Sequence, residues 1–389
     1  MHHPVVRIAL ATALLVASFS MYAPVLAVLL QQRGHGVAAV GAFAMIGFSC
    51  IAVLIPVMPK IFARWGEVRV CRIGNCLQLL ATIGYASFDE LWIWCAFAIL
   101  GGSGSAAVWN ATEALIARYS PPDKRGRITG LYQTLLGAAM AGGPFVPALF
   151  QISATQTLIV ASAVQAVGVL LLLRLASLDD FKTPNPTQAA PSHLPSSTGA
   201  MSTWTALTRV PALALIAFAG GVFESGLGSV SAANGATLGL SMAAAVSIVG
   251  ALGVGSFLCQ FPAGLMADHW MPSRVFGAAG FLLLASSVMM VVSPYAPWLL
   301  WACAFIWGGV GGALYTLSMI RVAHQFSGQD TAAGSAAMIT GYTLGGALGP
   351  LVSGAALQSF AAPGLALWLG SLSIGVMFLS TRFRTPKID

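Results

Sequence analysis

Charged residues are scarce in this chain. Of its 389 residues only 7% are Asp, Glu, Lys or Arg, whereas 57% are hydrophobic. An ordinary soluble domain carries about 25% charged residues, so this shortage excludes water-soluble enzymes, nucleic-acid-binding proteins and disordered chains. The chain has 18 Lys and Arg but only 11 Asp and Glu, and this excess of positive charge must lie in short connections between the apolar runs. There it indicates how the chain is oriented in a membrane, and it does not indicate a nucleic-acid-binding surface.

Cysteine is sparse as well, and the six cysteines lie within apolar stretches. The close pair Cys71 and Cys76 lacks C-x-x-C spacing, so we interpret the cysteines as reduced residues that fill helix packing. The 14 methionines show no paired spacing typical of soft-metal transport. The apolar runs also lack a nucleophile elbow, a zinc-protease helix and a carboxylate cluster. We therefore expect no enzyme activity, no cofactor and no metal site.

Long apolar runs are what the sequence has in abundance. A bilayer span needs about 20 predominantly apolar residues, and transmembrane barrel strands are only about 9 to 11 residues long. The runs therefore predict an all-α membrane protein with twelve transmembrane helices. Their approximate limits are residues 8–30, 38–62, 70–88, 91–117, 128–150, 155–175, 210–231, 241–267, 274–293, 298–320, 331–357 and 364–381.

The basic residues predict how the chain is oriented. If both termini are cytoplasmic, every Lys and Arg except Arg33 falls on the cytoplasmic side. Cytoplasmic connections carry an excess of Lys and Arg, so we expect both termini inside.

The chain is also expected to have two halves. A polar, proline-rich stretch over residues 176–208 separates residues 1–175 from residues 209–389. The small-residue run at 101–106 recurs at 308–313, 207 positions later. We therefore predict two pseudo-symmetric six-helix bundles joined by a cytoplasmic linker, an architecture typical of transporters whose binding site lies near the midplane.

A loop motif carries a family resemblance. Residues 264–274 read Gly-Leu-Met-Ala-Asp-His-Trp-Met-Pro-Ser-Arg. This resembles the G-x-L-A-D-R-x-G-R-R signature that major facilitator superfamily transporters carry between helices 2 and 3, and often again between helices 8 and 9. The first copy, at residues 59–69, has lost the opening glycine and the aspartate. The resemblance covers almost the whole chain and implies the fold just predicted.

Within the superfamily, residues 102–113 and 260–268 resemble the YcaD-like branch of bacterial permeases. The resemblance implies a monomeric secondary transporter in the bacterial inner membrane, which moves a small organic solute as its two bundles rock. We expect proton-coupled efflux. Proton-coupled drug exporters usually carry an arginine and a glutamine where this chain has Ala98 and Gly101, which leaves proton-coupled uptake of a metabolite as an alternative. A non-transporting receptor or an enzyme is a further alternative.

Two acidic residues lie well inside the predicted spans, Glu113 and Glu224. A charge at mid-bilayer costs from about 2.5 to more than 10 kcal/mol, so such residues usually face a cavity and are functional. At about 1.5 Å per residue, Glu224 lies roughly 22 Å beyond Arg209, past the midplane, and Glu113 only about 7 Å from Arg118. Glu224 is therefore the better candidate for proton coupling. Glu113 has an alternative interpretation as a helix-end acid paired with a neighbouring arginine.

Arg321 occupies the repeat position next to the counterpart of Glu113. Because the inner ends of helices 4 and 10 approach each other in the superfamily fold when the cytoplasmic side is shut, the resemblance implies Glu113 and Arg321 as a cytoplasmic gate. The alternative is that Arg321 simply obeys the positive-inside bias.

The loop motif predicts a latch. Asp268 at the C-terminal end of its helix is poorly placed for the helix dipole, so it needs a partner such as Arg274. The first copy keeps Arg64 but has Ala63 in place of the aspartate, so we expect the latch to differ between the halves.

Four residues beside the glycine-rich runs are candidates for contacting an amphipathic substrate in a central cavity. They are Trp109, Asn110, Trp307 and Tyr315.

Overall fold

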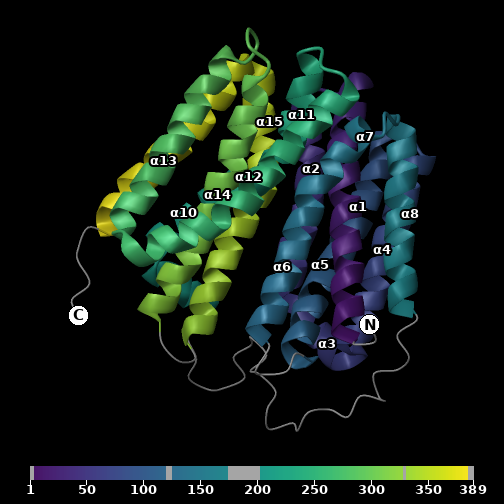
Figure 1. The fold of residues 1–389 in the computed structure, drawn as a ribbon, viewed down its shortest axis with the longest axis horizontal. Helices are drawn as coiled ribbons and strands as arrows, with labels where there is room; N and C mark the ends of the chain where they lie inside the picture. The colour runs from purple at the N-terminus through teal and green to yellow at the C-terminus, as the bar shows by residue number, and fades with distance from the viewer. Residues whose placement is uncertain (1–3, 120–124, 174–201, 327–329, 384–389) are drawn as a thin grey trace. The chain divides into compact units, whose positions relative to one another are not determined.

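The computed structural model describes residues 4–119, 125–173, 202–326 and 330–383. Within these ranges the regular structure is helical and contains no strand (Figure 1). Each of the twelve predicted apolar runs coincides with a helix, or with a helix interrupted by a short turn. The predicted all-α fold is therefore confirmed.

The chain divides into two compact units. Among the described residues, the first unit contains residues 4–26 and 49–173, and the second contains residues 27–48 and 202–383. The connection between the first two helices thus belongs to the second unit, although it lies early in the sequence.

The helices up to the predicted linker follow the apolar runs closely. They are α1 (Pro4–Gln32), α2 (Val37–Leu54), the 3-10 turn η1 (Ile55–Val57), α3 (Met58–Trp65), α4 (Glu67–Ser87), α5 (Leu91–Tyr119), α6 (Arg125–Gly142), the 3-10 turn η2 (Gly143–Phe145), α7 (Val146–Leu149) and α8 (Ala154–Leu173).

The helices from residue 203 onwards include two elements that the apolar runs do not predict, a short α9 at the end of the predicted linker and a π-helical turn η5. They are α9 (Thr203–Arg209), α10 (Pro211–Gly221), η5 (Val222–Gly226), α11 (Gly228–Thr237), α12 (Met242–His269), α13 (Pro272–Met289), the 3-10 turn η6 (Met290–Val292), α14 (Leu299–Gln325), α15 (Asp330–Ser380) and the 3-10 turn η7 (Thr381–Phe383).

Proline explains several interruptions. Proline has no backbone N–H and clashes with the preceding turn, so it interrupts a helix interior but suits a first turn. Pro56, Pro144 and Pro147 are the second residues of η1, η2 and α7, respectively. These prolines divide two of the predicted spans into shorter pieces without ending the span.

Within the described residues, eight helices are long and apolar enough to cross a membrane by length and composition, or nine if the bent pair of α9 with Pro211–Gly226 counts as one span. The count is below twelve for physical reasons. α15 contains two predicted spans, whereas α4 carries Glu67, Arg69 and Arg72, which lower its hydropathy. The number of crossings therefore stays a prediction.

α15 contains a sharp break. Phe360 and Ala361 are non-helical, and Ala361 has φ 53° and ψ −151°. The break ends two residues before Pro363, one of the two prolines inside α15. It falls between the predicted spans 331–357 and 364–381, so α15 corresponds to both of them.

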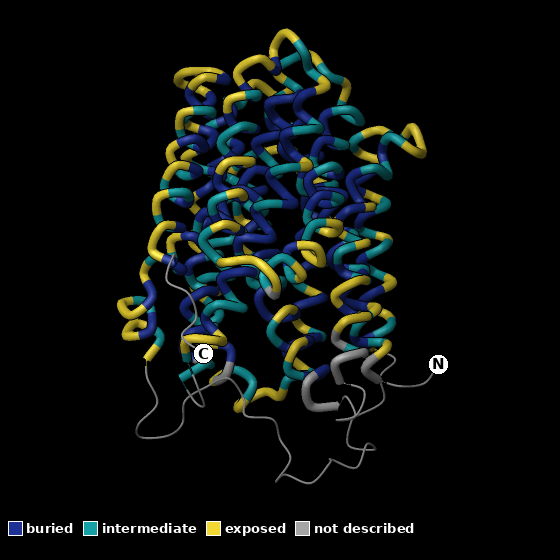
Figure 2. Tube along the Cα trace, turned by 60° about the vertical axis from the view of Figure 1, so that its left-hand side comes forward, coloured by how far each residue is buried: buried dark blue, intermediate teal, exposed yellow. Residues whose placement is uncertain are grey.

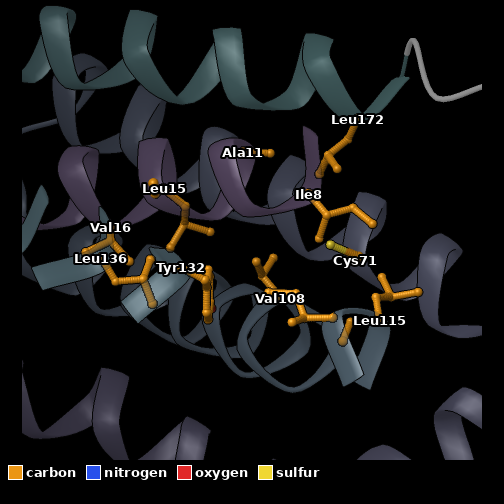
Figure 3. Close-up of a cluster of buried hydrophobic side chains, with 13 residues drawn as sticks. Ile8, Ala11, Leu15, Val16, Cys71, Val108, Leu115, Tyr132, Leu136 and Leu172 are labelled. Carbon is orange, nitrogen blue, oxygen red and sulfur yellow. The ribbon is translucent and has the colours of Figure 1, made fainter. Parts of the chain in front are cut away.

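The core of the first unit is built around α1. Apolar side chains of α1 pack against buried residues of α4, α5, α6 and α8, with Tyr132 of α6 among them (Figure 3). Burial of apolar surface stabilises such a cluster in proportion to its area. The labelled members are Ile8, Ala11, Leu15, Val16, Cys71, Val108, Leu115, Tyr132, Leu136 and Leu172.

Polar residues of α4 point inward and are paired. Gln78 is fully buried, donates to Tyr22 Oη over 2.7 Å and accepts from Ser105 Oγ over 3.3 Å. Gln165 of α8 donates to Asn75 Oδ1 over 3.2 Å. Because buried polar groups need partners, these bonds explain how a helix of modest hydropathy occupies the interior.

Large apolar side chains point outward from both units. Figure 2 shows exposed and buried residues alternating along the helices, and Trp92, Phe261 and Leu367 are each more than 70% exposed. A soluble monomer rarely exposes extensive apolar surface, whereas a protein surrounded by acyl chains does so. This pattern agrees with the composition in indicating a membrane protein.

In the second unit, α2 lies very close to α15. A Cβ added at Gly41 would overlap the carbonyl oxygen of Pro350. The backbone N–H of Ala38 donates to Gln358 Oε1 over 2.9 Å. Small residues permit such close approach of helix backbones in membranes, so this contact depends on glycine at position 41.

Candidate functional site

Glu224 lies at a break in helical geometry. α10 gives way to the π-helical turn η5, which contains Glu224, before α11 begins at Gly228. A single π-turn inserts an extra residue and re-aims the side chains that follow it, and such turns are frequent at functional sites. The break therefore places a carboxyl group at a non-standard position on an otherwise apolar segment.

Glycines allow this segment to lie close to two other helices. A Cβ at Gly220 would lie 2.8 Å from the carbonyl oxygen of Gly311 on α14. A Cβ at Gly221 would overlap the carbonyl oxygen of Tyr342 on α15. The face of α10 that carries Gly220 and Gly221 can therefore lie close to α14 and α15. This brings η5 within hydrogen-bonding range of polar groups on neighbouring helices.

Both oxygens of the Glu224 carboxylate accept hydrogen bonds from hydroxyl groups. Ser256 Oγ on α12 donates to Oε1, and Tyr342 Oη on α15 donates to Oε2 over 2.8 Å. Three separate helices therefore meet at this one acid. Hydrogen bonds to a charged group are stronger than those between neutral groups, so the site fixes the carboxylate in one orientation.

The hydrogen bonds continue on each side of the carboxylate. Ser225 Oγ lies 2.5 Å from Tyr342 Oη, and Gln260 Nε2 donates to Ser256 Oγ over 3.2 Å. Because the Tyr342 hydroxyl proton points to Glu224, Ser225 is the donor in the first pair. The five side chains form one continuous chain from Gln260 to Ser225, which we name the Glu224 network.

Two residues of α14 complete the surroundings. A Cβ at Gly312 would lie 2.7 Å from Glu224 Oε1 and 3.2 Å from Ser256 Oγ. The ring of Tyr315 lies 4.6 Å from that of Tyr342, centroid to centroid, at an interplanar angle of 46°. Gly312 therefore leaves the room that the carboxylate occupies, and Tyr315 supports the tyrosine that binds it.

The chemistry of the Glu224 network suits proton exchange. Among the described residues, the side-chain partners of Glu224 are both hydroxyl groups, which can donate or accept. A charged carboxylate accepts from both, and a protonated one can donate to either after a hydroxyl rotates. The backbone need not move between these two states.

The acid of the first unit has a different environment. Glu113 on α5 is exposed, and Trp109 Nε1 one turn earlier donates to its Oε1 over 2.9 Å. Asn110 Nδ2 donates to the carbonyl oxygen of Ala106 over 2.8 Å. The structure thus joins two of the predicted residues, Glu113 and Trp109, within α5, whereas Asn110 bonds to the backbone of the same helix.

The remaining candidates are separate from these sites. Trp307 on α14 is 1% exposed, and Arg321 further along α14 is partly buried with its Nε lacking a partner in the described part of the chain. Arg321 and Glu113 belong to different units. The proposed gate and the predicted substrate contact of Trp307 stay predictions.

The latch residues lie at helix ends. Asp268 falls in the last turn of α12, but its side chain is outside the described set, and Arg274 is exposed in the first turn of α13. Arg64 is exposed in the last turn of α3. The positions agree with a loop between helices, and the latch itself stays a prediction.

Sequence reasoning identified Glu224 and Tyr315 but missed Ser225, Ser256 and Tyr342. Serine and tyrosine occur throughout the apolar runs, so their identity gave no signal. Gln260 falls in the stretch that resembles the permease branch, and its spacing of four from Ser256 places both on one helix face.

The comparisons with known proteins agree on one family. The family model described as Major Facilitator Superfamily matches residues 8–258. The MFS-type transporter YfkF of Bacillus subtilis (strain 168) is 22% identical over 371 residues, which cover 95% of this chain and 92% of that protein. The MFS-type transporter YcaD of Shigella flexneri serotype 5b (strain 8401) is 26% identical over 329 residues, covering 81% and 77%.

Solved structures show the same fold. The nucleoside transporter NupG matches with a TM-score of 0.76 at 14% identity, over 100% of both chains. A bacterial homolog of the human lysosomal transporter Spinster, in an inward-facing and unoccupied conformation, matches with a TM-score of 0.72 at 16% identity, over 98% of this chain and 97% of that one. At such identities the likeness concerns the fold alone.

Proposed function

Since the chain belongs to the Major Facilitator Superfamily and is therefore a membrane transporter, we propose that it exports a small organic solute in exchange for protons. The membrane is the inner membrane of a bacterial cell, because the related MFS-type transporters are bacterial. The protein acts as a monomer whose two bundles rock to expose the site alternately to each side.

The Glu224 network carries this proposal. It places an acid between α12 and α15 with hydroxyl partners and no cationic partner among the described residues. A carboxylate held away from bulk water is neutralised by a proton or by a cationic substrate. Glu224 takes up a proton when the site faces outward and releases it when the site faces inward, which drives solute in the opposite direction.

The gate and the latch complete the proposed cycle. Glu113 and Arg321 pair when the cytoplasmic side is shut, and Asp268 with Arg274 stabilises one of the two access states. Neutralising either gate residue should alter the labelling of cavity cysteines by a soluble maleimide. An unchanged labelling pattern in both Glu113→Gln and Arg321→Gln would contradict the gate.

The first experiment tests coupling at Glu224. The purified protein in lipid nanodiscs is screened by thermal shift against a broad library of organic solutes, and the affinity of each hit is measured at two pH values. The affinity should depend on pH in the wild type and lose that dependence in Glu224→Gln. Glu90→Gln is the matched control, because Glu90 is an exposed acid outside the Glu224 network, the gate and the latch, and it should keep the wild-type dependence.

The second experiment tests direction. In inside-out membrane vesicles with an imposed acid interior, an exporter that exchanges solute for protons accumulates the hit, and Glu224→Gln should not. Accumulation in right-side-out vesicles with an acid exterior would instead support proton-coupled uptake. A pH dependence retained in Glu224→Gln would overturn the role of this acid.

A further inference from the structure

α3 is a short helix whose two faces differ in chemistry. It lies at the end of the first unit where α1 begins (Figure 1). One face carries Lys60 and Arg64, which are both exposed and lie about one helical turn apart. The other face is apolar, and the helix ends at Trp65. Helices with basic residues on one face and apolar residues, Trp among them, on the other lie in the plane of a membrane–water interface.

The apolar face of α3 packs on the rest of the first unit. Met58 is 3% exposed and belongs to a buried cluster with Val70 of α4 and Ala107 of α5. Ile61 and Phe62 pack against the same cluster. Because these contacts hold the apolar face of α3 against α4 and α5, the basic face is directed away from the protein.

The end of α3 carries an aromatic side chain suited to the same interface. Trp65 is 49% exposed, and Trp is enriched at membrane–water interfaces because its ring is apolar while its N–H needs a polar partner. The helix ends here because Gly66 has φ 77°, a conformation that glycine adopts without strain. α4 begins at the next residue, so Trp65 lies beside the first turn of α4.

The positive charge continues into α4. Arg69 is exposed in the first turn of that helix. Arg72, about one turn later, donates through its Nε to the carbonyl oxygen of Leu172 at the end of α8 over 3.2 Å. Lys60, Arg64 and Arg69 have no acidic partner in the part of the chain that the structure describes. Three exposed cations are therefore available close to the corner between α3 and α4.

This excess of charge selects an anionic ligand. Glu67 is the one acid in the sequence between residues 55 and 88. Ala63 stands where the second copy of the loop motif has Asp268, so Arg64 lacks the neighbouring aspartate of that copy. Guanidinium groups bind phosphate oxygens through paired hydrogen bonds, and basic residues beside a membrane attract anionic headgroups. A phospholipid can also place its acyl chains against the apolar surface around Trp65.

We propose that α3 and the first turn of α4 bind the headgroup of an anionic phospholipid, such as phosphatidylglycerol. We name this surface the α3 lipid site, and it consists of Lys60, Arg64, Trp65 and Arg69. It belongs to the first unit, whereas the Glu224 network belongs to the second. The chain passes from the second unit to the first between residues 48 and 49 of α2, and α3 follows η1. A lipid bound here therefore holds the end of a segment that links the two units.

The test counts single lipids bound to the purified full-length protein by native mass spectrometry in a non-ionic detergent. Phosphatidylglycerol and phosphatidylcholine with the same acyl chains are titrated separately. The wild type should bind the first phosphatidylglycerol at least about tenfold more tightly than phosphatidylcholine, and added salt should reduce this preference. The double variant Lys60→Gln/Arg64→Gln should bind phosphatidylglycerol about tenfold more weakly. Its affinity for phosphatidylcholine should stay unchanged, which separates lost recognition from misfolding.

A second double variant controls for net charge. Arg209 and Arg382 are exposed in the second unit, so Arg209→Gln/Arg382→Gln loses the same charge but should bind phosphatidylglycerol like the wild type. Equal affinity of the wild type for the two lipids, or unchanged binding in Lys60→Gln/Arg64→Gln, would overturn the proposal. An equal loss in both double variants would overturn it too, because the attraction would then be general. Displacement of the lipid by an equal concentration of glycerol 1-phosphate would make a soluble phosphate the ligand and would also overturn it.

Discussion

The contacts of the Glu224 carboxylate leave its two oxygen atoms little freedom to move. Its carboxylate accepts from Ser256 and Tyr342, and the space beside Oε1 exists because residue 312 has no side chain. The same acid on an ordinary α-helical turn, beside a bulkier neighbour, would not reach both hydroxyl groups.

Replacing Gly312 with alanine should break the hydrogen bond between Ser256 and the Glu224 carboxylate. The new Cβ would lie 2.7 Å from Glu224 Oε1, so the carboxylate must move away from Ser256. We expect the pH dependence of solute affinity to be lost as in Glu224→Gln, with a loss of stability of about 1–3 kcal/mol from overpacking. Solute binding at two pH values and thermal unfolding in nanodiscs measure the two effects.

Gly375→Ala is the matched control for that substitution. Gly375 is also a glycine of the second unit, but a Cβ there would meet no atom within 4 Å. This variant should keep the wild-type pH dependence and should not lose stability. A wild-type pH response in Gly312→Ala would show that the carboxylate tolerates displacement and would count against the geometry described for the Glu224 network.

Sequence could predict the acid but not its partners. Acidic residues are rare in the apolar runs, so Glu224 was conspicuous, whereas Ser256 and Tyr342 are of types that occur in many of the helices. Because these helices are apolar on most faces, their pattern does not fix their rotation about their own axes. The contacts that join α12 and α15 to η5 therefore required the structure.

At the scale of helices, α15 contains the most unusual backbone. Ala361 adopts φ 53° and ψ −151°, a conformation that is essentially restricted to glycine and costs about 1–3 kcal/mol for another residue. The break separates two predicted spans, so the surrounding packing maintains it against the preference of alanine.

Ala361→Gly should therefore stabilise the protein by up to about 2 kcal/mol, because glycine relieves the backbone strain and the freedom that it gives the unfolded chain offsets about 0.4–1 kcal/mol of that gain. A higher thermal unfolding temperature in nanodiscs is the expected result. Ala355→Gly is the control, since Ala355 is exposed on the regular part of α15 and glycine there should cost about 0.5–1 kcal/mol. Destabilisation by both substitutions would show that the break carries no strain.

The apolar runs predicted where helices occur, but not how they are interrupted. The breaks at η1, η2 and in α15 accompany prolines that are visible in the sequence. The π-turn η5 has no proline, and it accompanies contacts of its flanking glycines with α14 and α15. α9 (Thr203–Arg209) begins within the polar stretch 176–208, where the apolar pattern predicted no helix.

For the whole molecule, the sequence predicted the family and the all-helical membrane fold, and both are confirmed. Long apolar runs and the loop motif are properties of the sequence alone, so they could be recognised without coordinates. The assignment of residues 27–48 to the second unit could not be predicted from the sequence, because it depends on contacts between segments more than 300 positions apart.

The orientation in the membrane can be tested by cysteine labelling. Tyr295 is 90% exposed between η6 and α14, on the side predicted to be outside, and Trp204 is 75% exposed on α9, on the side predicted to be inside. A membrane-impermeant maleimide should label Tyr295→Cys in intact cells and Trp204→Cys only after lysis, both measured above the background of the native cysteines. The reverse pattern would invert the predicted topology.

The close approach of α2 to α15 has a consequence for how the polypeptide is assembled. The segment 27–48 is made early in synthesis, yet it packs on a helix that emerges near the end. Until then, Gly41 lacks the neighbours that it meets in the folded protein, which are Pro350 and Gly354 of α15. If the chain were cut within the polar stretch 176–208, the first fragment would carry Gly41 and the second would carry α15. The two fragments, synthesised separately, would therefore have complementary surfaces through which they could associate.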